Sequence, residues 1–169
     1  MAVEYPQYGL YEGRECNEEN ILNDIEGVLT YCINTLGFEQ KHIIVVGRSI
    51  GSGPACHIAS MCDIGALVLL SPFTSIKCVV GNIAGSLGKA LFKQRFDNQA
   101  KIPKVKAPIL IIHGDQDKLI PLEQSQKLQE ATNGKAKLHI NPGMKHEISH
   151  FADQIYGPMC EFLYSIELL

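Results

Sequence analysis

The sequence predicts an α/β fold in which a mostly parallel β-sheet carries helices on both faces. Apolar runs of strand length recur along the chain, at 42–46, 66–70, 108–112 and 137–140. Stretches whose apolar residues follow helical spacing separate these runs. Strands that are apolar almost throughout are typical of parallel sheets, because helices cover both of their faces.

Local signals predict the remaining elements. A short strand is predicted at 2–5. A helix is predicted to begin after Asn17, whose side chain is suited to cap it, with Glu18 and Glu19 favouring the positive end of its dipole. Gly37 is expected to end this helix. Further helices are predicted at about 50–62, 75–94, 121–132 and 148–166.

Length and composition indicate a single domain that spans 1–169. Hydrophobic residues make up 46% of the chain and charged residues 20%, which is typical of folded globular proteins. The net charge of −3 argues against a broad surface for nucleic acid. No apolar run reaches the roughly 20 residues of a membrane span, and no signal-peptide pattern opens the sequence. The six cysteines are scattered without a CxxC pair, which favours reduced thiols in a cytoplasmic protein.

The turn after the strand at 42–46 carries the strongest chemical signal. Gly47, Ser49 and Gly51 form a G-x-S-x-G pattern there, which is the nucleophile-elbow pattern when a strand breaks into a helix. Both glycines are predicted to be necessary, because side chains at these positions would collide in so tight a turn. The alternative is a glycine-rich turn whose serine only caps the helix. Arg48 is expected to pair with a neighbouring helix rather than to bind an anionic substrate.

Base and acid candidates follow two later strands. A serine hydroxyl needs a base to remove its proton, and His146 lies in the loop after the last predicted strand. Asp115 and Asp117 follow the strand at 108–112 and could orient that histidine. Asp117 is preferred because it lies further along the loop, and Asp115 is expected to shape the turn. Since active sites of such folds lie at the carboxyl ends of the strands, these side chains are expected to converge.

Two rival chemistries are weaker. Residues 146–150 match the zinc-peptidase pattern HExxH, but the pair 142–143 is Pro-Gly and puts this motif at a loop-to-helix junction. A third zinc ligand would have to be Glu161 or Glu167. The glycines after the first long strand fail as a dinucleotide fingerprint because Cys56 replaces the third glycine, and no P-loop follows. No metal or cofactor is therefore expected.

Several segments together resemble a known family, the α/β-hydrolase superfamily of serine hydrolases. They are similar to its eukaryotic branch that includes protein depalmitoylases, and they lie at 3–9, 47–55, 69–73, 95–98 and 108–114.

The resemblance implies roles for the residues already singled out. It makes Ser49 the nucleophile, Asp117 the acid and His146 the base. The amide of Ile50 becomes one donor of the oxyanion hole. The implied reaction is cleavage of a carboxylic ester or thioester, an acyl-protein thioester among them, through an acyl-enzyme on the serine. The implied location is the cytoplasm, with its membrane surface as the alternative.

The resemblance covers only the later two-thirds of the family's domain. The N-terminal third, with the His-Gly loop that supplies the second oxyanion amide, would precede Met1. The strand at 42–46 is then expected to have an exposed edge, which favours a homodimer across that edge or a rearranged N-terminus. Losing one oxyanion donor costs about 100- to 1000-fold in rate, so a catalytically impaired binding module is the alternative function.

A helical segment around 73–104 corresponds to the family's lid. Its apolar side chains are expected either to pack on the sheet or to line an acyl pocket. These side chains are Phe73, Ile76, Val79, Val80, Ile83, Leu87, Leu91 and Phe92.

Overall fold

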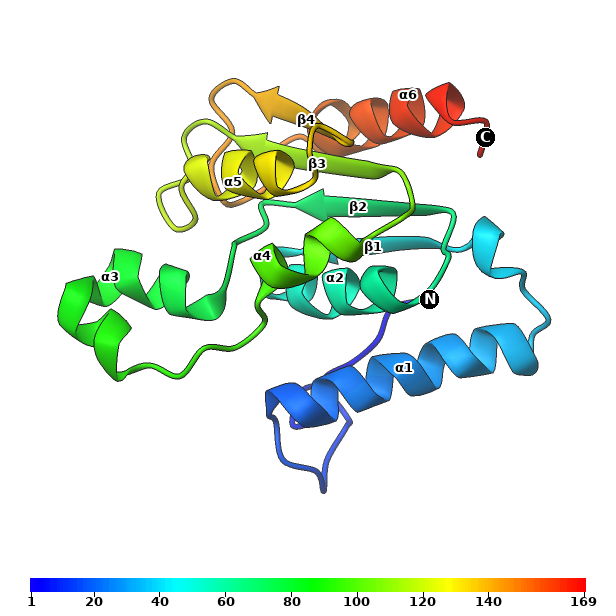
Figure 1. Ribbon diagram of the computed structural model, residues 1–169, viewed down its shortest axis with the longest axis horizontal. Helices are drawn as coiled ribbons and strands as arrows, with labels where there is room; N and C mark the ends of the chain where they lie inside the picture. The colour runs from blue at the N-terminus through cyan, green and yellow to red at the C-terminus, as the bar shows by residue number, and fades with distance from the viewer.

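The central element of the fold is a parallel sheet. The computed structural model describes the backbone of residues 1–169 and the side chains of 1–85 and 90–169. In the chain so described the sheet has four strands in the order β1-β2-β3-β4, and all neighbours run parallel (Figure 1). The strands are β1 (Ile44–Arg48), β2 (Ala66–Leu70), β3 (Ile109–Gly114) and β4 (Ala136–Asn141). The four predicted strands with long apolar runs are thereby confirmed, and their carboxyl ends share one edge of the sheet.

Helices cover both faces of the sheet, as the sequence predicts (Figure 1). Leu67 and Ile109 face a cluster built with α1, α2 and α5, whereas Val68 and Leu110 face a second cluster built with α6. Successive residues of a strand point to opposite faces, so a strand that is apolar throughout contributes to both clusters. The helices are α1 (Glu18–Asn34), α2 (Ser52–Met61), α3 (Ile76–Leu91), α4 (Asn98–Lys101), α5 (Glu123–Ala131) and α6 (Gly157–Ser165).

The first helix begins where the sequence predicts. The side chain of Asn17 accepts a hydrogen bond from the backbone N–H of Asn20 at 2.9 Å, which is the expected N-cap. The helix ends at Asn34, and Gly37 follows with a φ of 73°, in the left-handed region that glycine adopts without strain.

The predicted strand at 2–5 is wrong. Its backbone joins no ladder of the described sheet. Tyr5 instead packs against the side-chain cluster of Ile21, Phe73 and Phe96. The pattern that suggested a strand therefore reflects the partial burial of one aromatic side chain rather than backbone pairing.

The last helix begins later than predicted, because the backbone N–H groups near its predicted start donate to a side chain. The side-chain oxygen of Gln154 accepts hydrogen bonds from the N–H groups of Ser149 and His150. A π-helical turn follows at Ala152–Tyr156 and leads into α6. Pro158 has no N–H to give the carbonyl of Gln154, and that carbonyl accepts from the Asn141 side chain instead.

Helix α3 extends away from the sheet (Figure 1). Phe73, just before it, is buried, and Ile76 and Val79 pack partly against the Phe73 cluster. Packing of the whole segment on the sheet is therefore wrong, because Ile83 and Leu91 are exposed and the described α3 side chains that pack on the body of the protein lie in its first turns. The side chain of Leu87 lies outside the described residues. Within the part of the chain that is described, no helix is both long and apolar enough to cross a bilayer.

Candidate active site

Ser49 occupies a strained turn between β1 and α2. Its φ is +52°, in the left-handed region, which costs a residue other than glycine about 1 kcal/mol. A short 3₁₀ turn, Ser49–Gly51, connects the strand to the helix. A serine held in this conformation at the top of a parallel sheet is the geometry of a nucleophile elbow.

The glycines around this turn are not equivalent. A Cβ on Gly47 would lie 2.5 Å from the carbonyl oxygen of Gly51 and 2.6 Å from the Cβ of Ala55, so the predicted need for glycine is confirmed at position 47. At Gly51 the prediction is wrong. Its φ of −63° is that of an ordinary helix, and an added Cβ would meet only the Tyr5 hydroxyl, at 3.6 Å. Glycine is also required at position 53, which the G-x-S-x-G pattern does not include, because an added Cβ would lie 2.5 Å from the ring of Phe96.

The structure brings Ser49, Asp117 and His146 together. His146 Nδ1 lies 2.7 Å from Asp117 Oδ2, and His146 Nε2 lies 3.1 Å from Ser49 Oγ. A carboxylate only accepts, so Nδ1 donates to it and Nε2 is left to accept the serine proton. The three side chains come from the carboxyl ends of β1, β3 and β4, as the parallel topology predicts.

Both oxygens of the Asp117 carboxylate have partners. The Oδ1 atom accepts the backbone N–H groups of Leu119 and Ile120 at 2.9 and 2.8 Å. The Oδ2 atom is left for His146, and the Asp117 side chain is fully buried. Two backbone donors thus hold the carboxylate in the orientation that the imidazole needs.

A second histidine, His113 at the end of β3, supports this aspartate. Its Nε2 lies 2.8 Å from the carbonyl oxygen of Ile120 and 3.5 Å from Asp117 Oδ2, and its Nδ1 lies 2.6 Å from Ser125 Oγ. A carbonyl only accepts, so Nε2 carries the proton and Nδ1 accepts from the serine hydroxyl. Burial lowers the pKa of His113 and keeps the ring neutral. This role is absent from the predictions made above, and the one sequence signal for it is a histidine placed inside an apolar strand.

The loops after β3 and β4 are fastened to each other. Asp115 Oδ1 accepts the backbone N–H of Gly143 at 2.7 Å, so the side chain bonds to the histidine loop and not, as predicted, within its own turn. The Gln116 N–H donates to the carbonyl of Met144 at 3.1 Å. A Cβ on Gly114 would lie 2.0 Å from that carbonyl oxygen, so only glycine permits this approach. The loop that carries His146 is thereby held against the loop that carries the acid.

Arg48 also contacts the histidine loop. Its guanidinium donates to the backbone carbonyl of His146 at 2.9 Å. The expected pairing with a neighbouring helix is wrong, because the side chain reaches across the carboxyl edge of the sheet instead. Arg48 thus connects the strand before Ser49 to the loop that carries the base.

The amide of Ile50 lies in the first turn after the serine. The first N–H groups of a helix have no acceptor within it, and the helix dipole makes this end positive. The Ile50 side chain is exposed, so the turn is open to solvent. This geometry suits an oxyanion donor, and that role for Ile50 stays a prediction.

The HExxH residues, 146–150, do not form a zinc-binding helix. They lie in irregular structure before the π-helical turn, so the two imidazoles lack the helical spacing that the motif needs. Both ring nitrogens of His146 are engaged by Asp117 and Ser49. Among the side chains described, no group of three or more His, Cys, Asp or Glu is arranged to hold a metal ion.

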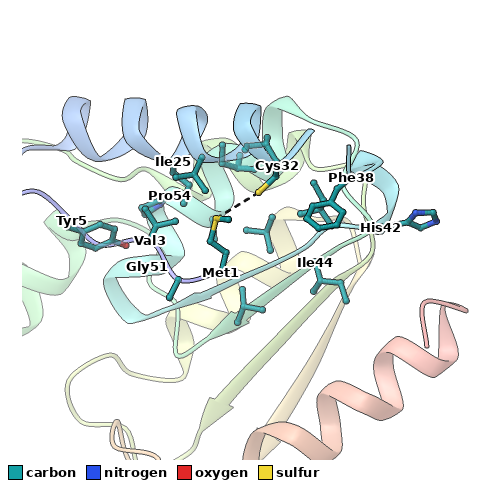
Figure 2. A pocket seen from close by; sticks show the side chains of 18 residues that line it. Met1, Val3, Tyr5, Ile25, Cys32, Phe38, His42, Ile44, Gly51 and Pro54 are labelled. Carbon is teal, nitrogen blue, oxygen red and sulfur yellow. Dashed lines mark hydrogen bonds between the residues drawn. The ribbon is translucent and has the colours of Figure 1, made fainter. Parts of the chain in front are cut away.

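A cavity of about 560 Å³ lies beside the elbow, along the outer edge of β1 (Figure 2). Tyr5 and Gly51 line one end of it, and Phe38 and His42 line the other. Its wall is mainly apolar, with side chains from α1, β1 and the N-terminal segment. Ser49 is not among the lining residues, so the cavity adjoins the candidate site without containing it.

Comparison with known proteins gives matches along most of the chain. The family model described as "Serine aminopeptidase, S33" matches residues 77–151, which include Asp117 and His146. The alpha/beta hydrolase domain-containing protein 17B of Xenopus laevis is 29% identical over 163 residues, which are 96% of this chain and 54% of that protein. The alpha/beta hydrolase domain-containing protein aho-3 of Caenorhabditis elegans is 31% identical over 146 residues, or 86% of this chain and 43% of that protein.

Solved structures share the fold. An alpha-beta serine hydrolase homologue from Coxiella burnetii superposes with a TM-score of 0.60 and 19% identity, covering 96% of this chain and 64% of that one. The chain spans about half the length of the curated relatives that it matches. The matched sequences and the parallel sheet therefore both indicate the α/β-hydrolase fold.

Proposed function

We propose, since this chain belongs to the α/β-hydrolase superfamily, that it acts as a serine hydrolase that cleaves carboxylic esters or thioesters. The observation that carries the proposal is the continuous set of hydrogen bonds from Asp117 through His146 to Ser49. Each contact has the direction that proton transfer from the serine requires.

The reaction follows from this geometry. Ser49 Oγ attacks the substrate carbonyl while His146 Nε2 takes the hydroxyl proton. The amide of Ile50 donates to the oxyanion of the tetrahedral intermediate. His146 then gives its proton to the leaving alcohol or thiol, which departs and leaves an acyl ester on Ser49. A water molecule, deprotonated by the same imidazole, hydrolyses that ester, and the proton returns to the serine.

Within this class, an acyl-protein thioester is our proposed substrate. The similarity to the alpha/beta hydrolase domain-containing protein 17B supports it, together with the depalmitoylase-like segments of the sequence. A thiolate leaves more readily than an amine, so the serine mechanism needs less leaving-group protonation with a thioester than with an amide.

A comparison of leaving groups tests the proposal. One acyl group is presented as an oxygen ester, a thioester and an amide, and initial rates are measured for the wild-type chain and for Ser49→Ala. We expect hydrolysis of the ester and the thioester, slower or no cleavage of the amide, and a loss of about 10⁴- to 10⁶-fold in kcat with Ser49→Ala. Equal rates for wild type and Ser49→Ala would contradict the proposal and favour a binding module.

A further inference from the structure

Ser49 and His146 follow strands that are not neighbours in the sheet. The strand order is β1-β2-β3-β4, so β2 and β3 lie between the strand before the serine and the strand before the histidine (Figure 1). With about 4.8 Å between neighbouring strands, β1 and β4 are about 14 Å apart. The ladders of the described sheet therefore do not set the 3.1 Å distance between Ser49 Oγ and His146 Nε2.

The contact between His146 and Asp117 has local support instead. The loops that carry these two residues follow the neighbouring strands β3 and β4. Two hydrogen bonds fasten the loops to each other, one to the Asp115 side chain and one between backbone groups. The acid and the base thus keep their relative position independently of β1, whereas the contact between Ser49 and His146 gains nothing from these bonds.

Arg48 supplies a second hydrogen bond between the elbow and the histidine loop. Its guanidinium Nη2 donates to the backbone carbonyl of His146 at 2.9 Å. Among the hydrogen bonds of the described residues, this bond and the one from His146 to Ser49 are the two that join residues 47–53 to residues 141–150. Because Arg48 immediately precedes Ser49, its bond acts on the two residues whose distance matters for proton transfer.

The alternation of side chains along β1 directs Arg48 toward this loop. Successive residues of a strand point to opposite faces, so Arg48 shares a face of the sheet with Ile44. Ile44 packs against the cluster built with α6, and the loop that carries His146 leads into α6. The strand therefore presents a long donor side chain on the face toward which the histidine loop runs.

The guanidinium of Arg48 is available for this bond at every stage of the reaction. The side chain is exposed, and none of the salt bridges among the described residues involves it. An arginine stays charged under all working conditions and donates from a rigid, planar group. The bond to the carbonyl can therefore persist while the imidazole of His146 takes up and releases its proton.

We propose that Arg48 is a positioning residue, which holds the backbone of His146 at the distance from the elbow that proton transfer from Ser49 requires. The proposal rests on the proposed hydrolase reaction, in which Nε2 of the imidazole takes the serine proton. Arg48 does not touch the reacting atoms. Without it, the histidine loop should move away from β1 while the imidazole stays bound to Asp117, and a misplacement of about 1 Å can cost about 100-fold in rate.

Two variants at position 48 test this role by kinetics. Arg48→Met keeps much of the length of the side chain but has no donor, whereas Arg48→Lys keeps a donor and the charge. With 4-nitrophenyl butyrate, a neutral ester, we expect Arg48→Met to reduce kcat by about 10- to 100-fold without raising KM. Labelling of Ser49 by a fluorophosphonate should slow by a similar factor, and Arg48→Lys should recover part of both rates.

A matched control removes one positive charge from the histidine loop itself. Lys145→Met changes an exposed side chain next to His146. We expect this variant to keep the wild-type kcat and labelling rate. A loss as large as that of Arg48→Met would show that charge near the site, rather than the bond to the carbonyl, is responsible, and it would contradict the proposal.

Nuclear magnetic resonance of the His146 ring tests the geometry without turnover. The ¹⁵N chemical shift of Nε2 depends on its hydrogen bond with Ser49, so Ser49→Ala should change that shift in the otherwise wild-type chain. We expect Ser49→Ala to leave the shift unchanged when it is added to Arg48→Met, because the contact is already lost there. Added to Lys145→Met, it should change the shift as in the wild type. The signal of the Nδ1 proton, which is bound to Asp117, should remain observable in every one of these chains.

Three results would overturn the proposed role of Arg48. They are wild-type rates in Arg48→Met, a rise in KM without a fall in kcat, which would make Arg48 a substrate-binding residue, and an effect of Ser49→Ala on the Nε2 shift that survives in Arg48→Met. A wild-type chain that reacts with neither the ester nor the fluorophosphonate would instead contradict the proposed function. The comparison of Nε2 shifts would still decide whether Arg48 sets the distance between the histidine and the serine.

Discussion

The turn that carries Ser49 depends more on Gly47 than on Gly51. Gly47→Ala would force a methyl group to within 2.5 Å of a backbone oxygen, so part of the elbow must shift. We expect the free energy of unfolding of this variant to fall by several kcal/mol. We also expect that serine-directed probes no longer label it. Gly51→Ala adds a methyl group in ordinary contact and within helical φ, so its stability should stay within about 1 kcal/mol of the wild type. Urea unfolding of both variants measures the difference, and equal losses would contradict this account of the turn.

The buried neutral His113 predicts how stability depends on pH. Burial lowers its pKa in the folded state below the ordinary value of 6.5, so the unfolded chain takes up a proton that the folded chain refuses. The stability it contributes is complete above pH 6.5 and falls as the pH drops from there toward the folded-state pKa, by at most about 1.4 kcal/mol for each pH unit.

Substitution isolates this contribution. Urea unfolding at about pH 7.5 and at about pH 5.5 should show a smaller loss on acidification for His113→Gln than for the wild type, by about 1 kcal/mol. His150→Gln, which changes an exposed histidine, serves as the control, and its unfolding free energy should depend on pH as that of the wild type does. An unchanged acid loss in His113→Gln would mean that His113 is not the group responsible.

At the residue scale, the sequence was sufficient to predict the three side chains that meet at the candidate site, but not all the groups that hold them. Ser49, Asp117 and His146 follow strand ends and belong to residue types with known chemistry, so spacing and topology were sufficient. Ser125 and Gly53 support the site through contacts between segments far apart in the chain. Such contacts leave no local pattern, because they depend on where tertiary packing brings the helices.

The two loops at the carboxyl edge behave as one unit. Asp115 fastens the acid loop to the histidine loop through Gly143, whereas Asp117 contacts the imidazole itself. Asp115→Ala should therefore lower the free energy of unfolding by about 1 kcal/mol. It should reduce kcat only modestly, because the loop after β3 is displaced but still carries Asp117. Asp117→Asn should keep most of the stability and reduce kcat by about 10⁴-fold, because the tautomer of His146 is no longer fixed.

Activity and unfolding measured on both variants check this assignment of roles. If Asp115→Ala removes activity as completely as Asp117→Asn, and Asp117→Asn retains substantial activity, the two aspartates have been assigned in reverse.

At the element scale, the apolar strands were the most predictable part of the fold. A strand that is buried on both faces must be apolar throughout, so its sequence alone reveals it. The errors fall at 2–5 and before α6, where single side chains such as Tyr5 and Gln154 determine the backbone path. Neither feature has a periodic sequence pattern. The segment at 2–5 has no partner strand, and the start of the last helix is determined by hydrogen bonds from two backbone N–H groups to the Gln154 side chain.

The described sheet has two edge strands, β1 and β4, and the edge formed by β1 is the one beside the candidate nucleophile. β1 is an edge strand of the described sheet, and Val46 on it is 52% exposed. Edge strands with apolar side chains pair readily with another chain, and an antiparallel pair of identical edges is self-complementary. We therefore expect a homodimer through β1, observable by size-exclusion chromatography with light scattering. Val46→Lys should give a monomer, and Met61→Lys, which adds the same charge to an exposed site on α2, should remain a dimer. A monomeric wild type would contradict this expectation.

We expect His146 and Asp117 to make Ser49 nucleophilic, and covalent labelling measures this reactivity without the need to know the substrate. The wild-type chain is treated with a fluorophosphonate, and the modified peptide is identified by mass spectrometry. We expect an adduct on Ser49, no adduct in Ser49→Ala, and labelling of His146→Gln slowed by orders of magnitude. A wild-type chain that stays unlabelled at Ser49, or labelling that is unaffected by loss of the histidine, would contradict it.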